Sequence, residues 1–390
     1  MPAAGRWNQP AHRGSQAMKV GFIVFLALRD IRFAKGRFLL MGTVVALITL
    51  LLVMLSGLTA GLGNQSVSAI RQLGSAGTNA VVFGSATGNS PTASFTESQI
   101  SREQVRIWQR ASGVESAEAF GVGQTRLSGA GSTNVAVFGV EPGGALAPSP
   151  VTDTSLVLSR TAADDLGAEV GDTVQLAGRD LEVSDVVDDQ WYSHTPVVWT
   201  SLDKWQQVSH INDGGAADGP IATAIAAQLS DGDLSGPAAA AANEAAGTTA
   251  TSVSGAFQAL GSYKSENGSL MLMQGFLYGI SALVIVAFLT VWTIQRTRDI
   301  AVLKAMGSSD AYLLRDALTQ AMVVLACGAA AGGGIGILGG VFASQAAPFL
   351  LTPASTLLPI AGIVVLGMAG AVLAVRRVTR VDPLTALGGS

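Results

Sequence analysis

Long apolar runs divide this chain into four segments that are each long enough to cross a membrane. They lie at residues 38–62, 270–294, 318–342 and 359–375. A helix needs about 20 apolar residues to cross the roughly 30 Å of hydrocarbon in a bilayer. Backbone groups in lipid must also be satisfied within their own segment. We therefore predict four transmembrane helices, at residues 38–62, 269–294, 317–343 and 359–376.

The pattern changes between the first two runs, where residues 63–266 alternate short polar and apolar stretches with glycine-containing turns. The spacing predicts a helix over 96–112, with Thr96 as its N-cap and Trp108 on its apolar face. Period-two alternation and turn residues predict strands at 79–83, 135–140, 155–158, 173–176, 181–187, 197–200 and 221–229. Further helices are expected at 63–73, 201–208 and 236–246, and a polar hinge at 262–268. The fold class is an α-helical membrane protein with four transmembrane helices plus a mixed α/β extracellular domain inserted between helices 1 and 2.

The charges change sign between these regions. Residues 63–266 carry 9 Lys+Arg against 22 Asp+Glu, whereas the rest of the chain carries 14 against 5. Because Lys and Arg are retained in short loops on the cytoplasmic side, this distribution predicts a multi-pass membrane protein with both termini cytoplasmic. The alanine- and glycine-rich composition suggests a bacterium with a GC-rich genome, so the membrane would be a bacterial plasma membrane. The 295–316 loop would then be cytoplasmic, and the 63–266 domain and the 344–358 loop extracellular.

The two ends of the chain are polar. Residues 1–17 show no periodicity, and we expect a disordered prefix there. Residues 18–37 interleave Phe and Ile with Arg and Lys, which predicts an amphipathic cytoplasmic helix at the membrane surface; a basic flank without that role is the alternative. Residues 377–390 are expected to form a cytoplasmic tail.

Small residues recur on the third apolar run. Gly332, Gly336 and Gly340 stand at every fourth position, which places bare backbone along one helix face for close packing. This pattern favours a rigid bundle within one chain over a dimer seam. We expect Gly362 and Gly370 of the fourth run to face it.

No catalytic or metal-binding constellation is visible. The chain has no GxxxxGK[ST] loop, its three histidines have no metal-ligand spacing, and Cys327 is its only cysteine. We therefore predict that the chain is not an enzyme and has neither a metal site nor an intrinsic cofactor. The spans also lack charges in their cores, which argues against transport driven by an ion gradient.

The stretch RTRDIAVLKAMGSSDAYLLRDAL, residues 296–318, resembles the R-x-x-E-I-x-x-L-x-A-x-G-A-S signature of the MacB/FtsX-like permeases of ABC transporters. Asp299 replaces the usual Glu, and Ser308 replaces Ala. Residues 27–38, 156–187 and 377–387 resemble the pre-span helix, the external-domain core and the tail of that family, with Thr385 where Glu is frequent. The order of the pieces along the chain strengthens the resemblance.

The resemblance implies a permease that forms a homodimer, lies in membrane lipid and recruits two copies of a separate ABC ATPase subunit, which binds the ATP. It implies mechanotransmission, in which ATP-driven motion inside is relayed to the external domain, and no contact with nucleic acid. The residues of the 295–316 loop expected to contact the ATPase are Arg298, Asp299, Leu303, Lys304, Met306 and Gly307.

The size and layout of the chain resemble those of haem-exporter permeases, which makes haem the first candidate substrate. Haem needs an apolar slot and one or two ligands such as His, Tyr, Met or a carboxylate. Residues of these types near the outer ends of the first two spans and in the QWYSHTP segment are Tyr263, Glu266, Met271, Met273, Tyr278, Met54, Tyr192 and His194. Tyr263 and Glu266 rank first because both lie on one helix face at the expected bilayer surface. Ordinary membrane packing is the alternative for Met271 and Met273, and an interfacial aromatic belt for the two helix tyrosines.

Two other functions remain open from the sequence. The substrate could be a peptide, an antibiotic or a lipid-like amphiphile. The chain could instead be an FtsX-like transmembrane regulator of cell-wall hydrolases or of a sensor kinase. In that case we expect a protein partner to dock on residues 189–199.

Overall fold

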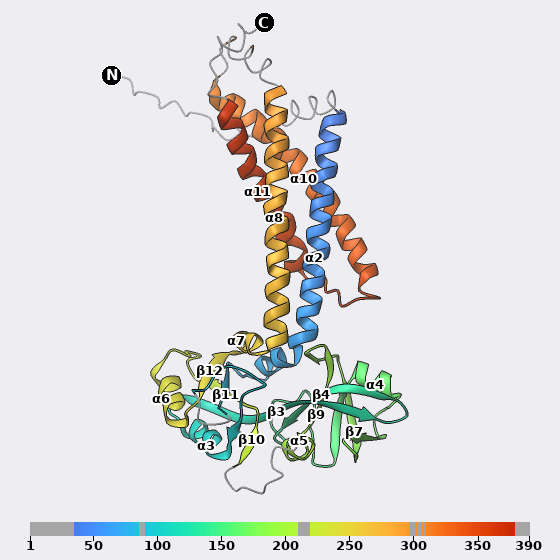
Figure 1. The fold of residues 1–390 in the computed structure, drawn as a ribbon, viewed down its shortest axis with the longest axis vertical. Coiled ribbons are helices and arrows are strands. Elements are labelled where there is room, and N and C mark those ends of the chain that lie inside the picture. Colours follow the sequence, from blue (N-terminus) through green and yellow to red (C-terminus); the bar gives the residue numbers. More distant parts are fainter. Residues whose placement is uncertain are drawn as a thin grey trace, which may run out of the picture. The chain divides into compact units, whose positions relative to one another are not determined.

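A computed structural model describes residues 35–85, 90–209, 219–295, 302, 306 and 309–378 of the 390. The chain divides into two units (Figure 1). Unit 1 contains the chain up to Ala60 and from Met271 onward, and unit 2 is Gly61–Leu270. The predicted prefix, nearly all of the amphipathic segment 18–37 and most of the tail lie outside the described residues.

Four long apolar helices dominate the described part of the chain. They are α2 (Lys35–Ser75), α8 (Gly261–Gln295), α10 (Asp310–Ala343) and α11 (Pro353–Val378). Each is long and apolar enough to cross a membrane. The predicted fold class, four spans with an α/β domain between the first and second, is therefore confirmed. The predicted hinge at 262–268 is wrong, because these polar residues are already helical in α8.

Glycines on α10 bring its backbone against α2 within unit 1. A Cβ at Gly332 would lie 2.1 Å from the Ala46 carbonyl oxygen, and one at Gly336 would lie 2.9 Å from a Val53 methyl carbon. No side chain larger than hydrogen fits at Gly332 without moving α2. The prediction of a packed seam within one chain is therefore confirmed.

Gly362 and Gly370 of α11 do not face this seam, so that part of the prediction is wrong. A Cβ at Gly362 would meet the Tyr278 ring at 3.0 Å, and one at Gly370 would meet a Val286 methyl carbon at 2.6 Å. Both contacts are with α8. Sequence spacing identified two small-residue faces but could not pair them with the correct helices.

The α10–α11 loop closes one end of the same seam. The Phe349 ring occupies the space in front of Gly57 and Gly340, where a Cβ would meet it at 2.2 and 2.5 Å. The Leu350 backbone N–H donates to the Gly57 carbonyl oxygen at 3.0 Å. Helix α2 is thus attached to both α10 and the loop that follows it.

Unit 2 contains a large mixed sheet and a separate two-stranded sheet. Its strands are β1 (Ala80–Phe83), β2 (Ile100–Ser101), β3 (Val114–Ser128), β4 (Ser132–Val140), β5 (Ser155–Ser159), β6 (Thr173–Leu176), β7 (Arg179–Val187), β8 (Trp191–Tyr192), β9 (Thr195–Ser201), β10 (Pro220–Ala222), β11 (Ala224–Leu229) and β12 (Thr249–Ser252). Its shorter helices are α3 (Arg102–Arg110), α4 (Arg160–Leu166), α5 (Leu202–Ser209), α6 (Pro237–Ala246) and α7 (Val253–Ala256).

Strand β3 joins the two halves of the large sheet. The strand order is β12-β1-β11-β3-β4-β9-β5-β7-β6, with β8 paired to β9. Strand β6 pairs back with β3 at Leu127↔Leu176, so the strands from β3 to β6 close into a ring. The first half of β3 pairs with β11 and extends the open half. One continuous strand therefore connects the open half of the sheet to the ring.

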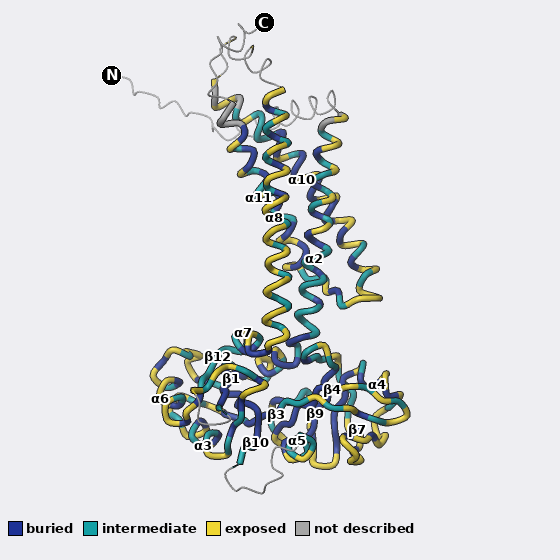
Figure 2. The backbone as a smooth tube through the Cα atoms, viewed as in Figure 1, coloured by how far each residue is buried: buried dark blue, intermediate teal, exposed yellow. Residues whose placement is uncertain are grey.

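The sheet carries a separate apolar core on each side. One core packs Val105 and Trp108 of α3, Trp205 of α5 and the alanines of α6 against the strands. The other packs the last turns of α2, including Ile70 and Leu73, against the opposite face. Figure 2 shows the central strands buried between them. The end of α2 is thus part of the core of unit 2.

Several predicted elements differ at their boundaries. Helix α3 begins at Arg102 and not near Thr96, because Ser101 and Gln104 form a reciprocal capping box with bonds of 3.3 and 2.9 Å. Strand β3 was not predicted. Strand β6 coincides with the predicted strand at 173–176, and α6 follows the prediction at 236–246 within one residue.

Candidate functional site

A β-hairpin tip in unit 2 contacts both α2 and α8. Strands β8 and β9 are joined by Ser193 and His194, whose φ values are 51° and 62°. Two residues with positive φ match the tight turn that suits the twist of a hairpin, although each non-glycine residue in this region costs about 1–2 kcal/mol. Tertiary contacts must hold this turn.

Those contacts are hydrogen bonds to α2. The backbone N–H of Ser193 donates to the Ser66 carbonyl at 3.0 Å, and that of His194 donates to the Gln65 carbonyl at 2.9 Å. The Trp191 N–H donates to the Ser68 hydroxyl at 2.8 Å. The hairpin therefore binds α2 through the backbone as well as through side chains.

The His194 ring extends these contacts to α8. Its Nε2 lies 2.9 Å from Glu266 Oε2 and 3.2 Å from Ser66 Oγ. Beside it, Ser193 Oγ lies 3.1 Å from Ser262 Oγ. We call this group the helix–hairpin joint; its members are Gln65, Ser66, Ser68, Ser193, His194, Ser262 and Glu266.

The hydrogen-bond network of the joint indicates where the His194 proton lies. Ser66 Oγ donates to the Leu62 carbonyl at 3.1 Å, so its hydroxyl proton is already used. Ser66 and Glu266 must then both accept from the N–H at Nε2, which assigns the proton to that nitrogen. The His194 and Glu266 side chains are 36% and 32% exposed, so the contact between them contributes at most about 1 kcal/mol.

The joint contains Ser, His and Glu, but it is not a nucleophilic triad. In a triad the carboxylate holds Nδ1 while Nε2 takes the serine proton. Here the carboxylate and the serine share Nε2, and the Ser66 proton points to a carbonyl. The geometry suits fastening two helices to the sheet rather than acyl transfer.

Tyr263 lies on α8 one turn before Glu266, as the sequence predicted. Its ring packs edge-on against Phe257 with a centroid distance of 6.1 Å, and the Arg71 guanidinium lies 5.7 Å from the centroid of the same Phe257 ring. Tyr263 therefore follows Ser262 of the joint along α8, while its ring packs on Phe257, which lies outside the joint.

Tyr192 lies in the core of unit 2 and not on its surface. Its ring meets Phe95 and Phe138 edge-on, with centroid distances of 5.8 and 5.6 Å. Burial raises the pKa of the Tyr192 hydroxyl, so the phenolate that would bind iron is disfavoured. The expected docking segment 189–199 also ends in the core, because Trp199 is fully buried.

The other predicted haem ligands belong to unit 1 and do not converge. Met54 packs with its sulfur 3.5 Å from the Cβ position of Gly339 on α10, whereas Tyr278 packs on Gly362 of α11. Met271 and Met273 are 61% and 55% exposed. The structure therefore brings together His194 and Glu266, with Tyr263 adjacent, and leaves these four dispersed.

Most of the predicted ATPase contacts, Arg298, Asp299, Leu303, Lys304 and Gly307, lie outside the described residues. Met306 is described; it is 71% exposed, and its N–H donates to the Val302 carbonyl at 3.0 Å. Its exposure leaves its side chain accessible to a partner.

A second titratable cluster in unit 2 lies at Glu118, Glu141 and Asp203. Burial, followed by the charges of Asp203 and Glu118, raises the pKa of Glu141. Glu118 Oε2 is buried and has no hydrogen-bond partner among the described residues. In the same part of the chain, no group of three or more His, Cys, Asp or Glu side chains is placed to hold a metal ion.

The sequence predicts only two residues of the joint, His194 and Glu266, as site residues, together with the neighbouring Tyr263. The other five residues of the joint were not predicted. Three of its serines, Ser66, Ser68 and Ser262, lie in helices whose sequence looks like an ordinary polar continuation of the spans. The two consecutive positive φ values at Ser193 and His194 have no glycine or asparagine to reveal them. The contacts themselves join residues more than 60 positions apart.

Two protein-family models together match most of the chain. A MacB-like periplasmic core domain matches residues 25–245, more than half of the chain, and an FtsX-like permease C-terminal domain matches residues 254–383. A Staphylococcus epidermidis protein named as a hemin transport system permease, HrtB, is 24% identical over 371 residues, covering 93% of this chain and 99% of that protein. An uncharacterized ABC transporter permease of Mycobacterium tuberculosis is 25% identical over 382 residues, covering 94% of this chain and 100% of that protein.

Among solved structures, the periplasmic region of MacB from Actinobacillus actinomycetemcomitans is similar at 15% identity. It covers 47% of this chain and 92% of that chain, with a TM-score of 0.34. At this score it adds nothing to the two domain matches.

Proposed function

Because the chain belongs to the MacB/FtsX-like family of ABC transporter permeases, we propose that it exports haem or a comparable amphiphile from the outer leaflet of the membrane. Two copies of the chain would act with two copies of a separate ATPase subunit that binds and hydrolyses ATP. The termini and the 295–316 loop would face the cytoplasm, and unit 2 would lie outside.

Support for haem comes from the similarity to the protein named as a hemin permease and from the side chains at the joint. Tyr263 and Glu266 are the ligand types that haem iron and its surroundings require. His194 donates its Nε2–H in the closed joint, so it could bind iron through that nitrogen only after releasing Glu266 and Ser66. We therefore retain Tyr263 and Glu266 as the first candidates.

The observation that carries the proposed mechanism is the joint. Helices α2 and α8 each continue from unit 1 into unit 2 without a break. The hairpin tip fastens both of them to the sheet of unit 2 within about one helical turn, through backbone and side-chain bonds. Motion that begins in the spans would therefore reach unit 2 through these two helices. The described spans carry no charged side chain in their cores, which suits a relay that needs no hydrophilic channel.

Haem binding tests the substrate. Haemin added to the purified full chain in nanodiscs should shift the Soret band, and Glu266→Gln should weaken binding. Glu182→Gln, which neutralises an exposed carboxylate on β7, is the matched control. If Glu266→Gln binds haemin as tightly as wild type, the site assignment fails. If wild type shows no Soret shift while another amphiphile stimulates the ATPase of the complex, that amphiphile replaces haem as the proposed substrate. The proposed role as a permease remains.

A removable cross-link tests the relay. The hydroxyl oxygens of Ser193 and Ser262 are 3.1 Å apart. Ser193→Cys with Ser262→Cys, in a Cys327→Ser background, should therefore form a disulfide. If the joint moves as one rigid body, the oxidised protein should keep substrate-stimulated ATPase activity in the complex with its ATPase. His194→Ala with Ser66→Ala should reduce this stimulation and leave basal hydrolysis unchanged. Activity lost on oxidation and regained on reduction would contradict a rigid joint.

A further inference from the structure

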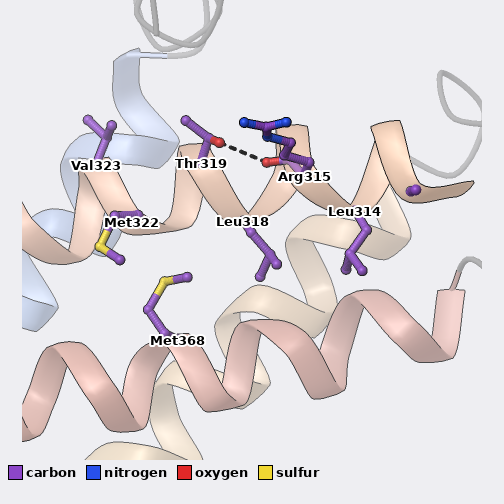
Figure 3. A pocket seen from close by; sticks show the side chains of 8 residues that line it. Leu314, Arg315, Leu318, Thr319, Met322, Val323 and Met368 are labelled. Atoms are coloured by element: carbon purple, nitrogen blue, oxygen red, sulfur yellow. Dashed lines mark hydrogen bonds between the residues drawn. The ribbon is translucent and has the colours of Figure 1, made fainter. Parts of the chain in front are cut away.

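A groove of about 480 Å³ lies on unit 1 between the beginning of α10 and the last part of α11 (Figure 3). Leu318 and Met322 of α10 line it on one side and Met368 of α11 on the other, with the two methionine side chains facing each other. Its volume is within the range of about 300–1,000 Å³ found for small-molecule sites. The lining suits a flexible apolar chain because methionine adapts to irregular shapes.

The groove has one charged side chain, Arg315. The only other polar side chain in its lining, Thr319, donates its hydroxyl proton to the Arg315 carbonyl at 2.8 Å. Among the described residues no carboxylate forms an ion pair with Arg315. The adjacent Asp316 accepts from the Gln320 amide at 3.0 Å. The guanidinium is thus a cation without an anion in the described part of the chain.

Depth in the bilayer decides which anion fits. The apolar part of α10 begins at Leu314, so Arg315 lies in the first turn of the span, where lipid phosphates are. Leu318 and Met322 follow roughly 5 and 10 Å deeper along the helix, at about 1.5 Å per residue. Along α10 the cationic residue therefore comes before the apolar floor, in the same order as the phosphate and the acyl chain of a lipid in the leaflet that this end of the span would enter.

We propose that this groove binds one anionic phospholipid, with its phosphate on Arg315 and an acyl chain along Leu318, Met322 and Met368. Charge complementarity supports this occupant, because arginine binds phosphate oxygens through two parallel N–H donors. A lipid also satisfies both ends of the groove at once, whereas a free phosphate would leave the apolar floor empty.

Native mass spectrometry of the purified full chain, titrated with phosphatidylglycerol or phosphatidylcholine of identical acyl chains, tests the proposal. Wild type should prefer phosphatidylglycerol. Arg315→Gln should reduce that preference about fivefold, the effect of one basic side chain at a membrane surface. Arg315→Lys should keep part of it, and Met368→Trp, which fills the groove, should reduce binding of both lipids. Lys264→Gln, which removes an exposed charge from α8 at a residue that does not line the groove, should leave the preference unchanged.

Equal binding of the two lipids by wild type, or an equal loss in the Lys264 and Arg315 variants, would overturn the proposal. Displacement of the lipid by millimolar inorganic phosphate would show a simple anion site instead. Lipid binding that increases when residues 1–34 are removed would identify the N-terminal segment as the occupant. A dimer-to-monomer shift in Met368→Trp without lipid loss would identify a second copy.

Discussion

The contact between Gly332 and α2 allows a sharp test of the bundle. In Gly332→Ala the new Cβ would lie 2.1 Å from the Ala46 oxygen and 2.8 Å from its carbonyl and α carbons, below the 3.0 Å that Cβ contacts respect. The colliding atoms belong to the backbone, so the helices must separate by about 1 Å. Overpacking of this kind costs about 1–3 kcal/mol.

Gly334 supplies the matched control, because it is exposed on the same helix and nothing lies within 4 Å of its Cβ position. There an alanine should be neutral or stabilise by about 0.5–1 kcal/mol. The two variants should therefore differ by about 1–4 kcal/mol, or roughly 2–16 °C in apparent melting temperature. Size-exclusion chromatography of heated samples in one detergent measures the difference.

Second-site changes separate backbone from side-chain collisions. Ala46→Gly should not rescue Gly332→Ala, since the oxygen remains. Val53→Ala should rescue Gly336→Ala, whose Cβ meets only side-chain atoms of Val53 and Leu50. Equal melting temperatures for Gly332→Ala and Gly334→Ala, or rescue by Ala46→Gly, would refute the reasoning.

Three further predictions concern unit 2 of the full-length protein. Ala177→Asn should stabilise the β6–β7 hairpin by about 0.5–1 kcal/mol, because Ala177 has φ 48° before Gly178 and Asn-Gly is favoured in such a turn; slower amide exchange in β6 and β7 would show it. Asp189→Ala should cost about 1 kcal/mol, since Asp189 accepts the Thr161 N–H at 2.7 Å at the start of α4; amide exchange in α4 that stays as slow as in wild type would contradict this. The raised pKa of Glu141 means that the folded state binds the proton more tightly, so stability falls as pH rises from the ordinary carboxyl pKa to the raised one. Glu141→Gln should therefore melt at a higher temperature at neutral pH and lose that part of the pH dependence; identical melting curves from about pH 4 to pH 8 would exclude it.

The sequence predicts the elements that depend on local composition. The four spans follow from uninterrupted apolar runs, and the strand at 173–176 follows from alternation bounded by glycine turns. The sequence also contains the capping box of α3, because Ser101 and Gln104 stand at the required spacing, but Thr96 offers a competing N-cap signal. The error in the predicted helix start came from choosing between two local signals.

Features that depend on distant contacts were not predictable. Strand β3 was missed because Gly121 and Gly123 interrupt its apolar alternation. The structure explains Gly121 by the Trp205 ring, which lies 2.1 Å from where its Cβ would be. The helix–hairpin joint likewise depends on the fold bringing His194 to two helices that lie more than 60 positions away on either side of it in the chain.

The position of β1 has a consequence for the synthesis of this protein. Strand β1 lies between β11 and β12, with Ala80 paired to Ala227 on one side and to Ser252 on the other. It leaves the ribosome among the first residues of unit 2, yet both of its neighbours are among the last. Until then both edges of β1 are bare and can pair with other chains. Closing such distant pairs is intrinsically slow, so the nascent chain needs its longest protection at Ala80–Phe83, and a ribosome stalled before Ala224 would release a product that cannot complete this sheet.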